Sequence, residues 1–247
     1  MGVVPSPFEF SNFADVGTSE PFLARIALGL VEILDTTYYP KRTEIKAGIM
    51  ETMKSLMSAF IALRHLRSVA GDRSAPLMTK MTHFDDMCGS LWTAYKDRMQ
   101  NVTQLMGYNI GFLFEPDKNF DKGCASFPTE HPQVDGALIQ LMKQHRATWQ
   151  SDLERFRNQY IEHRKLKQEG VASLYSLPNA EAFFKNVRVG IEEILIILMA
   201  AGLPPALCLL EIPQAERNAQ VPKRFRVSLR GPLKRVNPDG TEWKQGT

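Results

Sequence analysis

An arginine, an asparagine and a histidine lie close together in the charged stretch LERFRNQYIEHRKLKQ, residues 153–168. Arg157 and Asn158 are adjacent, and His163 follows five residues after Asn158. Histidine gains and loses a proton near neutral pH, and a guanidinium group can bind a phosphate through two donors. The asparagine amide could hydrogen-bond the phosphate or orient the histidine ring. These residue types together would suit proton transfer at a phosphodiester.

The residues before this group predict the helix that carries it. Apolar and aromatic side chains recur at steps of three and four, as expected for one face of a helix that packs on a neighbour. The stripe consists of Leu138, Met142, His145, Trp149, Leu153, Phe156, Tyr160 and His163. We therefore expect His163 to face a partner element, with Arg157 at the edge of the stripe.

The spacing of Arg157 and His163 is awkward for a site on one straight helix. They are six positions apart, which corresponds to about 9 Å along the axis of an ideal helix and to different faces. The two side chains would meet at one phosphate only if the helix end were distorted or a second chain contributed a copy of the motif.

The segment RNQYIEH resembles the HEPN signature, an arginine followed by a polar residue, a short spacer and a histidine. The resemblance covers residues 133–203, where the motif closes a long helix and a loop and a final apolar helix follow. It implies a bundle of four or five helices, usually dimeric. It also implies metal-independent endoribonuclease activity of the toxin or defence type, because many members of that family cleave RNA in such systems.

The resemblance also implies roles for individual residues. His163 would be the acid or base, Arg157 the phosphate ligand and Asn158 the orienting residue, with the motifs of two protomers facing each other. Further RNA contacts are expected from Arg155, Tyr160, Arg164 and Lys165. The expected partners are RNA, a second copy of the chain and a protein such as an antitoxin. No metal or other cofactor is expected.

Other interpretations of the same residues stay open. A helix rich in Glu, Arg and Lys is often a solvated face, and a histidine on an aromatic stripe is often a packed core residue. The first alternative is therefore a non-catalytic helical module that binds RNA or a protein. The second is a helical protein that binds a small molecule or haem, although nothing in the sequence marks a haem ligand.

The remaining motifs exclude several function classes. The chain has neither HExxH, ExxH nor the glycine-rich loops of common nucleotide-binding folds. In HFDDMC, residues 83–88, a helix would point the side chains in several directions, which disfavours a metal site. The three cysteines, Cys88, Cys124 and Cys208, form no CxxC pair, which favours a reducing compartment and hence the cytoplasm.

Charge and hydropathy add two further expectations. The net charge of +3 is too small to dictate a nucleic-acid partner by itself. The uncharged run 194–210 is interrupted by Pro204 and Pro205, which favours a buried helix followed by a turn over a membrane span.

The periodicity of the whole chain predicts an all-α fold, an up-and-down bundle of four to five long helices. Residues 1–20 are expected to form an N-terminal arm, 21–203 the helical domain and 204–247 a C-terminal extension. Helices are expected at about 21–38, 42–69, 77–114, 133–167 and from Asn179, as N-cap, to about 202. Residues 115–132, with three prolines, are expected to form a loop, and the NPDG turn in 223–244 suggests a hairpin or a basic tail.

Overall fold

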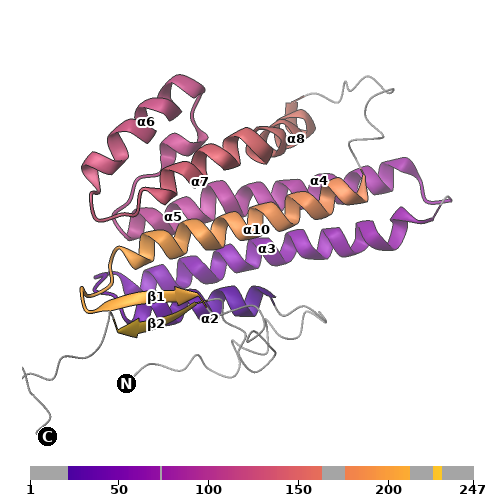
Figure 1. Ribbon diagram of the computed structural model, residues 1–247. Coiled ribbons are helices and arrows are strands. Elements are labelled where there is room, and N and C mark those ends of the chain that lie inside the picture. The colour runs from indigo at the N-terminus through magenta and orange to yellow at the C-terminus, as the bar shows by residue number, and fades with distance from the viewer. Residues whose placement is uncertain (1–21, 73, 163–175, 212–224, 230–247) are drawn as a thin grey trace, which may run out of the picture.

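The computed structural model describes residues 22–72, 74–162, 176–211 and 225–229, except for the side chains of residues 22, 24, 25 and 158–162. It confirms an all-α bundle with a short C-terminal hairpin (Figure 1). The helices are α2 (Phe22–Asp35), α3 (Arg42–Ala70), α4 (Leu77–Trp92), α5 (Met99–Leu105), α6 (Asp117–Glu130), α7 (Ala137–His145), α8 (Ser151–Glu162) and α10 (Leu177–Ala200). The short turns η1 (Thr93–Arg98) and η3 (Arg146–Gln150) are π-helical, and η2 (Gly111–Phe114) is a 3-10 helix.

Helix α10 is the central element of the bundle. It packs against α2, α3, α4, α5 and α7, and Figure 1 shows it running through the middle of the molecule. Such enclosure follows from its sequence, because a helix that is apolar on most sides must be covered on most sides. Its buried residues are Ala180, Phe183, Phe184, Val187, Gly190, Ile191, Ile194, Leu195, Ile196, Leu198 and Met199.

The start of α10 differs from the expectation that Asn179 is the N-cap. The N-cap is Ser176, whose Oγ accepts a hydrogen bond of 3.3 Å from the backbone N–H of Asn179. Ser176 has extended backbone angles, and Pro178 occupies the first turn, where its missing N–H costs no hydrogen bond. The helix therefore begins before the expected position.

Two long helices each contain a π-helical turn. The first runs without a break from α4 through η1 into α5, and the second from α7 through η3 into α8. The first was expected to continue to Phe114, but α5 ends at Leu105. Gly107 follows with φ of 91°, a left-handed conformation that ends a right-handed helix and suits glycine.

The expectation of a loop at residues 115–132 is wrong, because Asp117–Glu130 forms α6. Phe120, Cys124 and Phe127 recur at steps of four and three, and all three are buried. Pro116 precedes the helix, where a proline is tolerated, and Pro128 lies in its last turn. The three buried side chains outweigh the local cost of the prolines.

The hairpin forms between segments other than those that the NPDG turn suggested. Strand β1 (Leu207–Glu211) pairs antiparallel with β2 (Phe225–Leu229), with Leu207 opposite Leu229. The apolar run 194–210 thus ends α10 and then supplies most of β1. The N-terminal arm at 1–20 and the NPDG turn lie outside the described residues.

The same uncharged run does not amount to a membrane span. Among the helices that the structure describes, none combines the length and the apolar character needed to cross a bilayer.

Close contact between α10 and α7 depends on Gly190. A Cβ atom at this position would lie 2.7 Å from Cε1 of the buried His145. The imidazole ring therefore occupies the space in which any other residue of α10 would carry its side chain. Gly89 in α4 is a useful contrast, because a Cβ there would meet nothing within 4 Å.

We expect Gly190→Ala to lower the free energy of unfolding by about 1–3 kcal/mol, since overpacking must move His145 or the helix. Gly89→Ala should instead raise it, by up to about 1 kcal/mol, because alanine favours the helix. Urea unfolding followed by circular dichroism measures both. Equal stabilisation by the two substitutions would contradict the close contact.

Candidate functional site

Three aromatic side chains fix helix α8, which carries the motif, on the bundle. The ring of Phe156 in α8 lies 5.1 Å from that of Phe84 in α4 and 5.6 Å from that of Phe183 in α10, measured between centroids. Phe84 and Phe183 also contact each other, at 6.3 Å. The six stripe residues from Leu138 to Phe156 are all buried, which confirms that part of the expected helix face.

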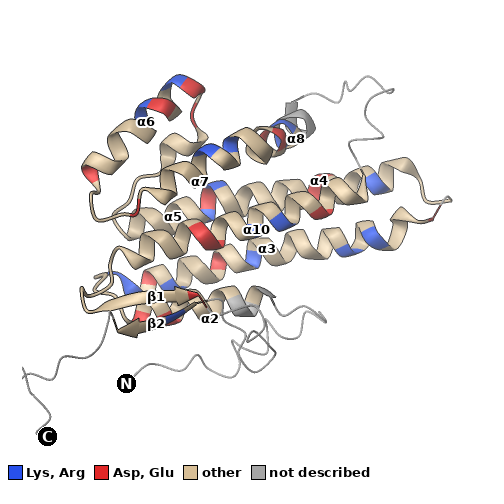
Figure 2. Cartoon of the chain, in the orientation of Figure 1, with Lys and Arg blue, Asp and Glu red and all other residues tan. Residues whose placement is uncertain are grey.

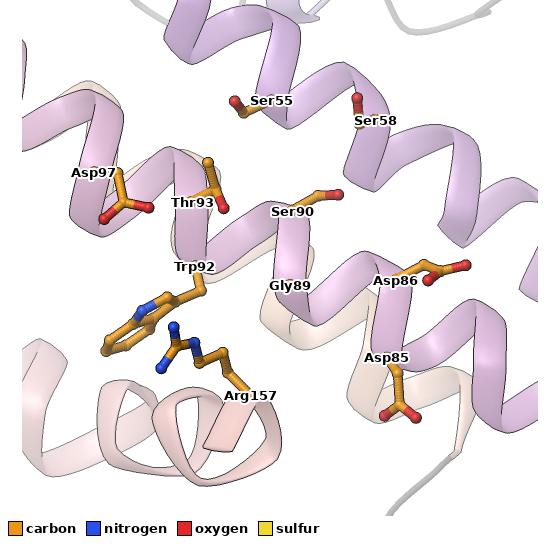
Figure 3. A pocket seen from close by; sticks show the side chains of 10 residues that line it. All are labelled: Ser55, Ser58, Asp85, Asp86, Gly89, Ser90, Trp92, Thr93, Asp97 and Arg157. Atoms are coloured by element: carbon orange, nitrogen blue, oxygen red, sulfur yellow. The ribbon is translucent and has the colours of Figure 1, made fainter. Parts of the chain in front are cut away.

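Arg157 follows Phe156 directly and lines a cleft of about 490 Å³. The cleft lies where α8 meets α4 and η1, with one side formed by α3 (Figure 3). Its lining is polar except for one indole and one glycine. The residues are Ser55, Ser58, Asp85, Asp86, Gly89, Ser90, Trp92, Thr93, Asp97 and Arg157.

The guanidinium group of Arg157 lies beside the indole of Trp92 in Figure 3. The Trp92 side chain is only 3% exposed, so it offers a fixed surface. Lys96 is a second cation near the same indole, with Nζ 5.4 Å from the ring centroid. Attraction between cations and an aromatic face favours such positions. The side chain of Arg157 is itself half-buried at the cleft.

The charge of the cleft is acidic on balance. Asp85, Asp86 and Asp97 line it against the single guanidinium of Arg157. Hydroxyl groups supply the rest of its polar lining. Those of Ser55 and Ser58 donate to backbone carbonyls of α3, so they meet a ligand as acceptors. Three carboxylates around one arginine repel a phosphate inside the cleft and attract a cation.

The structure describes only some of the other predicted site residues. Arg155 is exposed, and its Nη2 lies 3.2 Å from Oδ1 of Asp152, one turn earlier in α8. The side chains of Asn158 and Tyr160 lie outside the described part of the chain, although both residues belong to α8. His163, Arg164 and Lys165 lie outside the described residues altogether. That a distorted helix end or a second protomer brings Arg157 and His163 to one phosphate therefore stays a prediction.

Sequence reasoning missed the polar wall of the cleft. Asp86, Ser90, Thr93 and Asp97 recur at steps of four, three and four and thus share one face of the continuous helix α4–η1. This polar stripe was visible in the sequence. What the sequence did not reveal is that Arg157, from a distant segment, lies against the same wall. Figure 2 shows acidic positions on α4, and both acidic and basic positions on α8.

A second polar group lies inside the bundle, between the two π-helical turns. The hydroxyl of Tyr95 in η1 is 3.2 Å from Nδ1 of His145, which directly precedes η3. The Tyr95 ring also packs on Trp149 of η3, with centroids 4.9 Å apart. Burial lowers the pKa of His145 to about 4 and raises that of Tyr95, because both charged forms would lose solvation. Both groups are therefore neutral in the fold.

We expect His145 to make the fold less stable in mild acid. Below its ordinary pKa of 6.5 the unfolded chain takes up a proton at this residue, whereas the folded chain resists it down to about 4. Above pH 6.5, protonation of His145 does not lower the free energy of unfolding. That free energy falls by about 3 kcal/mol as the pH drops to about 4.

His145→Gln should remove this part of the pH dependence. The measurement is the free energy of unfolding of both proteins at several pH values between 7 and 4, with His131→Gln as the control. Parallel pH profiles for wild type and His145→Gln would contradict a neutral, buried His145.

The described residues contain no group of three or more His, Cys, Asp or Glu side chains that could hold a metal ion. Comparison with known proteins adds no identity: no family model, no curated protein and no solved structure matches the chain.

Proposed function

We propose that the chain is a HEPN-like, metal-independent endoribonuclease of the toxin or defence type that acts on RNA as a homodimer. The order of elements supports this proposal. Helix α8 carries Arg157 and Asn158 near its end, and the long apolar helix α10 follows after residues 163–175, which lie outside the described part. The resemblance in RNQYIEH implies this arrangement.

The position of Arg157 is the observation that carries the proposal. Arg155, two residues earlier, is exposed and pairs with Asp152, as a surface arginine commonly does. Arg157 is half-buried and lines the cleft beside Trp92. A guanidinium held by its surroundings loses less entropy when it binds a phosphate than one that moves freely in solvent.

In the proposed reaction, the 2′-hydroxyl of the RNA attacks the adjacent phosphorus atom. One His163 takes the 2′ proton, and the departing 5′ oxygen receives a proton from the His163 of the second protomer. The P–O5′ bond breaks, so the products end in a 2′,3′-cyclic phosphate and a 5′-hydroxyl. Arg157 stabilises the negative charge that develops on the phosphoryl oxygens. The acidity of the cleft requires the phosphate to approach Arg157 from the open side.

We expect the purified protein to cleave RNA in the presence of EDTA. His163→Ala and Arg157→Gln should each lower the rate at least about 100-fold, since each removes a proton carrier or a stabilising charge. Lys185→Gln, which removes an exposed charge from α10, should leave the rate unchanged. Gel analysis of labelled RNA measures the rate, and treatment of the products with a phosphatase identifies the cyclic end.

Equal cleavage by wild type, His163→Ala and Arg157→Gln would overturn the proposal. Circular dichroism of each variant establishes that it is folded. Cleavage that stops in EDTA would also contradict a metal-independent mechanism.

The acidic cleft favours a second candidate function, a non-catalytic module that binds a basic segment of a protein partner. Asp85, Asp86 and Asp97 provide negative charge, and the cleft volume of about 490 Å³ has room for lysine or arginine side chains. Charge complementarity of this kind raises the rate of association and selects the partner.

We expect a labelled oligolysine peptide to bind at low salt. The double substitution Asp86→Asn with Asp97→Asn should weaken binding by roughly tenfold, about 1.4 kcal/mol, because it removes two attractive charges. Fluorescence anisotropy measures the dissociation constant. A matched control, Asp121→Asn with Glu115→Gln, removes two exposed acidic charges outside the cleft. If the two double variants bind equally, net charge and not the cleft governs binding.

A further inference from the structure

Two histidines meet across the seam between α3 and α4. His65 belongs to α3 and His83 to α4, and their ring centroids are 5.3 Å apart with an angle of 52° between the planes. The two helices pack along their length, so the backbone at both positions is fixed. His65 is exposed and His83 half-buried, which leaves the rings open to a solute.

The distance between the rings matches two imidazoles bound to one metal ion. A zinc–nitrogen bond is about 2.0–2.1 Å long, and the ring centroid lies about 1.1 Å beyond the nitrogen. Each centroid is then about 3.2 Å from the metal, and tetrahedral geometry places the two centroids about 5.2 Å apart. The observed 5.3 Å agrees with this value, so the two helices already hold the rings at the separation that one shared ion requires.

The pair lies on the same helix faces as the cleft. His65 follows Ser58 by seven residues on α3, and His83 precedes Asp86 by three on α4, and both steps return to one face of a helix. The carboxylate of Asp86 is thus one turn from His83, where it can accept a hydrogen bond from a metal-bound water. Such outer partners orient the ligands and raise affinity.

We propose that His65 and His83 form a binding site for a divalent transition-metal ion. The ion would be of the class that imidazole favours, Zn²⁺, Ni²⁺ or Cu²⁺, in preference to Mg²⁺ or Ca²⁺. The described residues supply two protein ligands, and water completes the coordination. A bound ion joins α3 to α4 and stabilises the helix pair. This inference is independent of RNA cleavage.

The test is thermal unfolding of the full chain without an affinity tag, after EDTA treatment and buffer exchange. Addition of ZnCl₂ or NiCl₂ should raise Tm by roughly 5–10 °C at about 100 times the Kd of the ion. His65→Gln and His83→Gln should each lose most of this shift, because one imidazole binds an ion far more weakly than two. His131→Gln should keep the full shift, and MgCl₂ should produce none.

Electron paramagnetic resonance of the Cu²⁺-loaded protein gives a second readout that does not depend on stability. We expect splitting from two imidazole nitrogens in the wild type and from one in each of His65→Gln and His83→Gln. A Tm shift of equal size in the wild type and in both variants would overturn the proposal. The absence of a shift with both ZnCl₂ and NiCl₂ would also overturn it and would identify the pair as a ring contact only.

Discussion

The structure depends on the burial of helix α10, which is apolar on most of its circumference. Helices from both halves of the chain must cover it, and the contact with α7 is close because Gly190 leaves room for His145. The same burial positions the motif helix. Phe183 of α10 contacts Phe84 and Phe156, so α8 is held against α4 and Arg157 is brought to the cleft wall.

The two polar groups of the bundle differ in charge, because one is buried in the core and the other lies at the cleft. Inside, Tyr95 and His145 satisfy each other and remain neutral, because a buried charge would cost several kcal/mol without a partner. At the cleft, the carboxylates of Asp86 and Asp97 are exposed to water, which moderates their repulsion, whereas Asp85 is half-buried with its Oδ1 enclosed. The π-helical turn η1 serves both groups, since it carries Tyr95 toward the core and Thr93 and Asp97 toward the cleft.

The two candidate functions use the cleft differently. A nuclease needs Arg157 to present its guanidinium to a phosphate at the open side. A module for a basic partner needs the carboxylates of Asp85, Asp86 and Asp97 inside. Arg157 weakens the second function by one charge, and the aspartates weaken the first by repelling phosphate. The same acidic wall therefore favours a basic partner and disfavours a phosphate inside the cleft.

The sequence by itself determined the helical elements with strong periodicity, such as α3 and the buried stripe from Leu138 to Phe156, because the step of three and four residues is a local property. It misjudged α6, whose three buried side chains are outnumbered by prolines and charges. Only the tertiary structure decided that Arg157 shares a cleft with Asp86 and Asp97, and that Leu207–Glu211 pairs with Phe225–Leu229. These contacts join segments far apart in the chain, and packing around α10, rather than any local pattern, determines which segments meet.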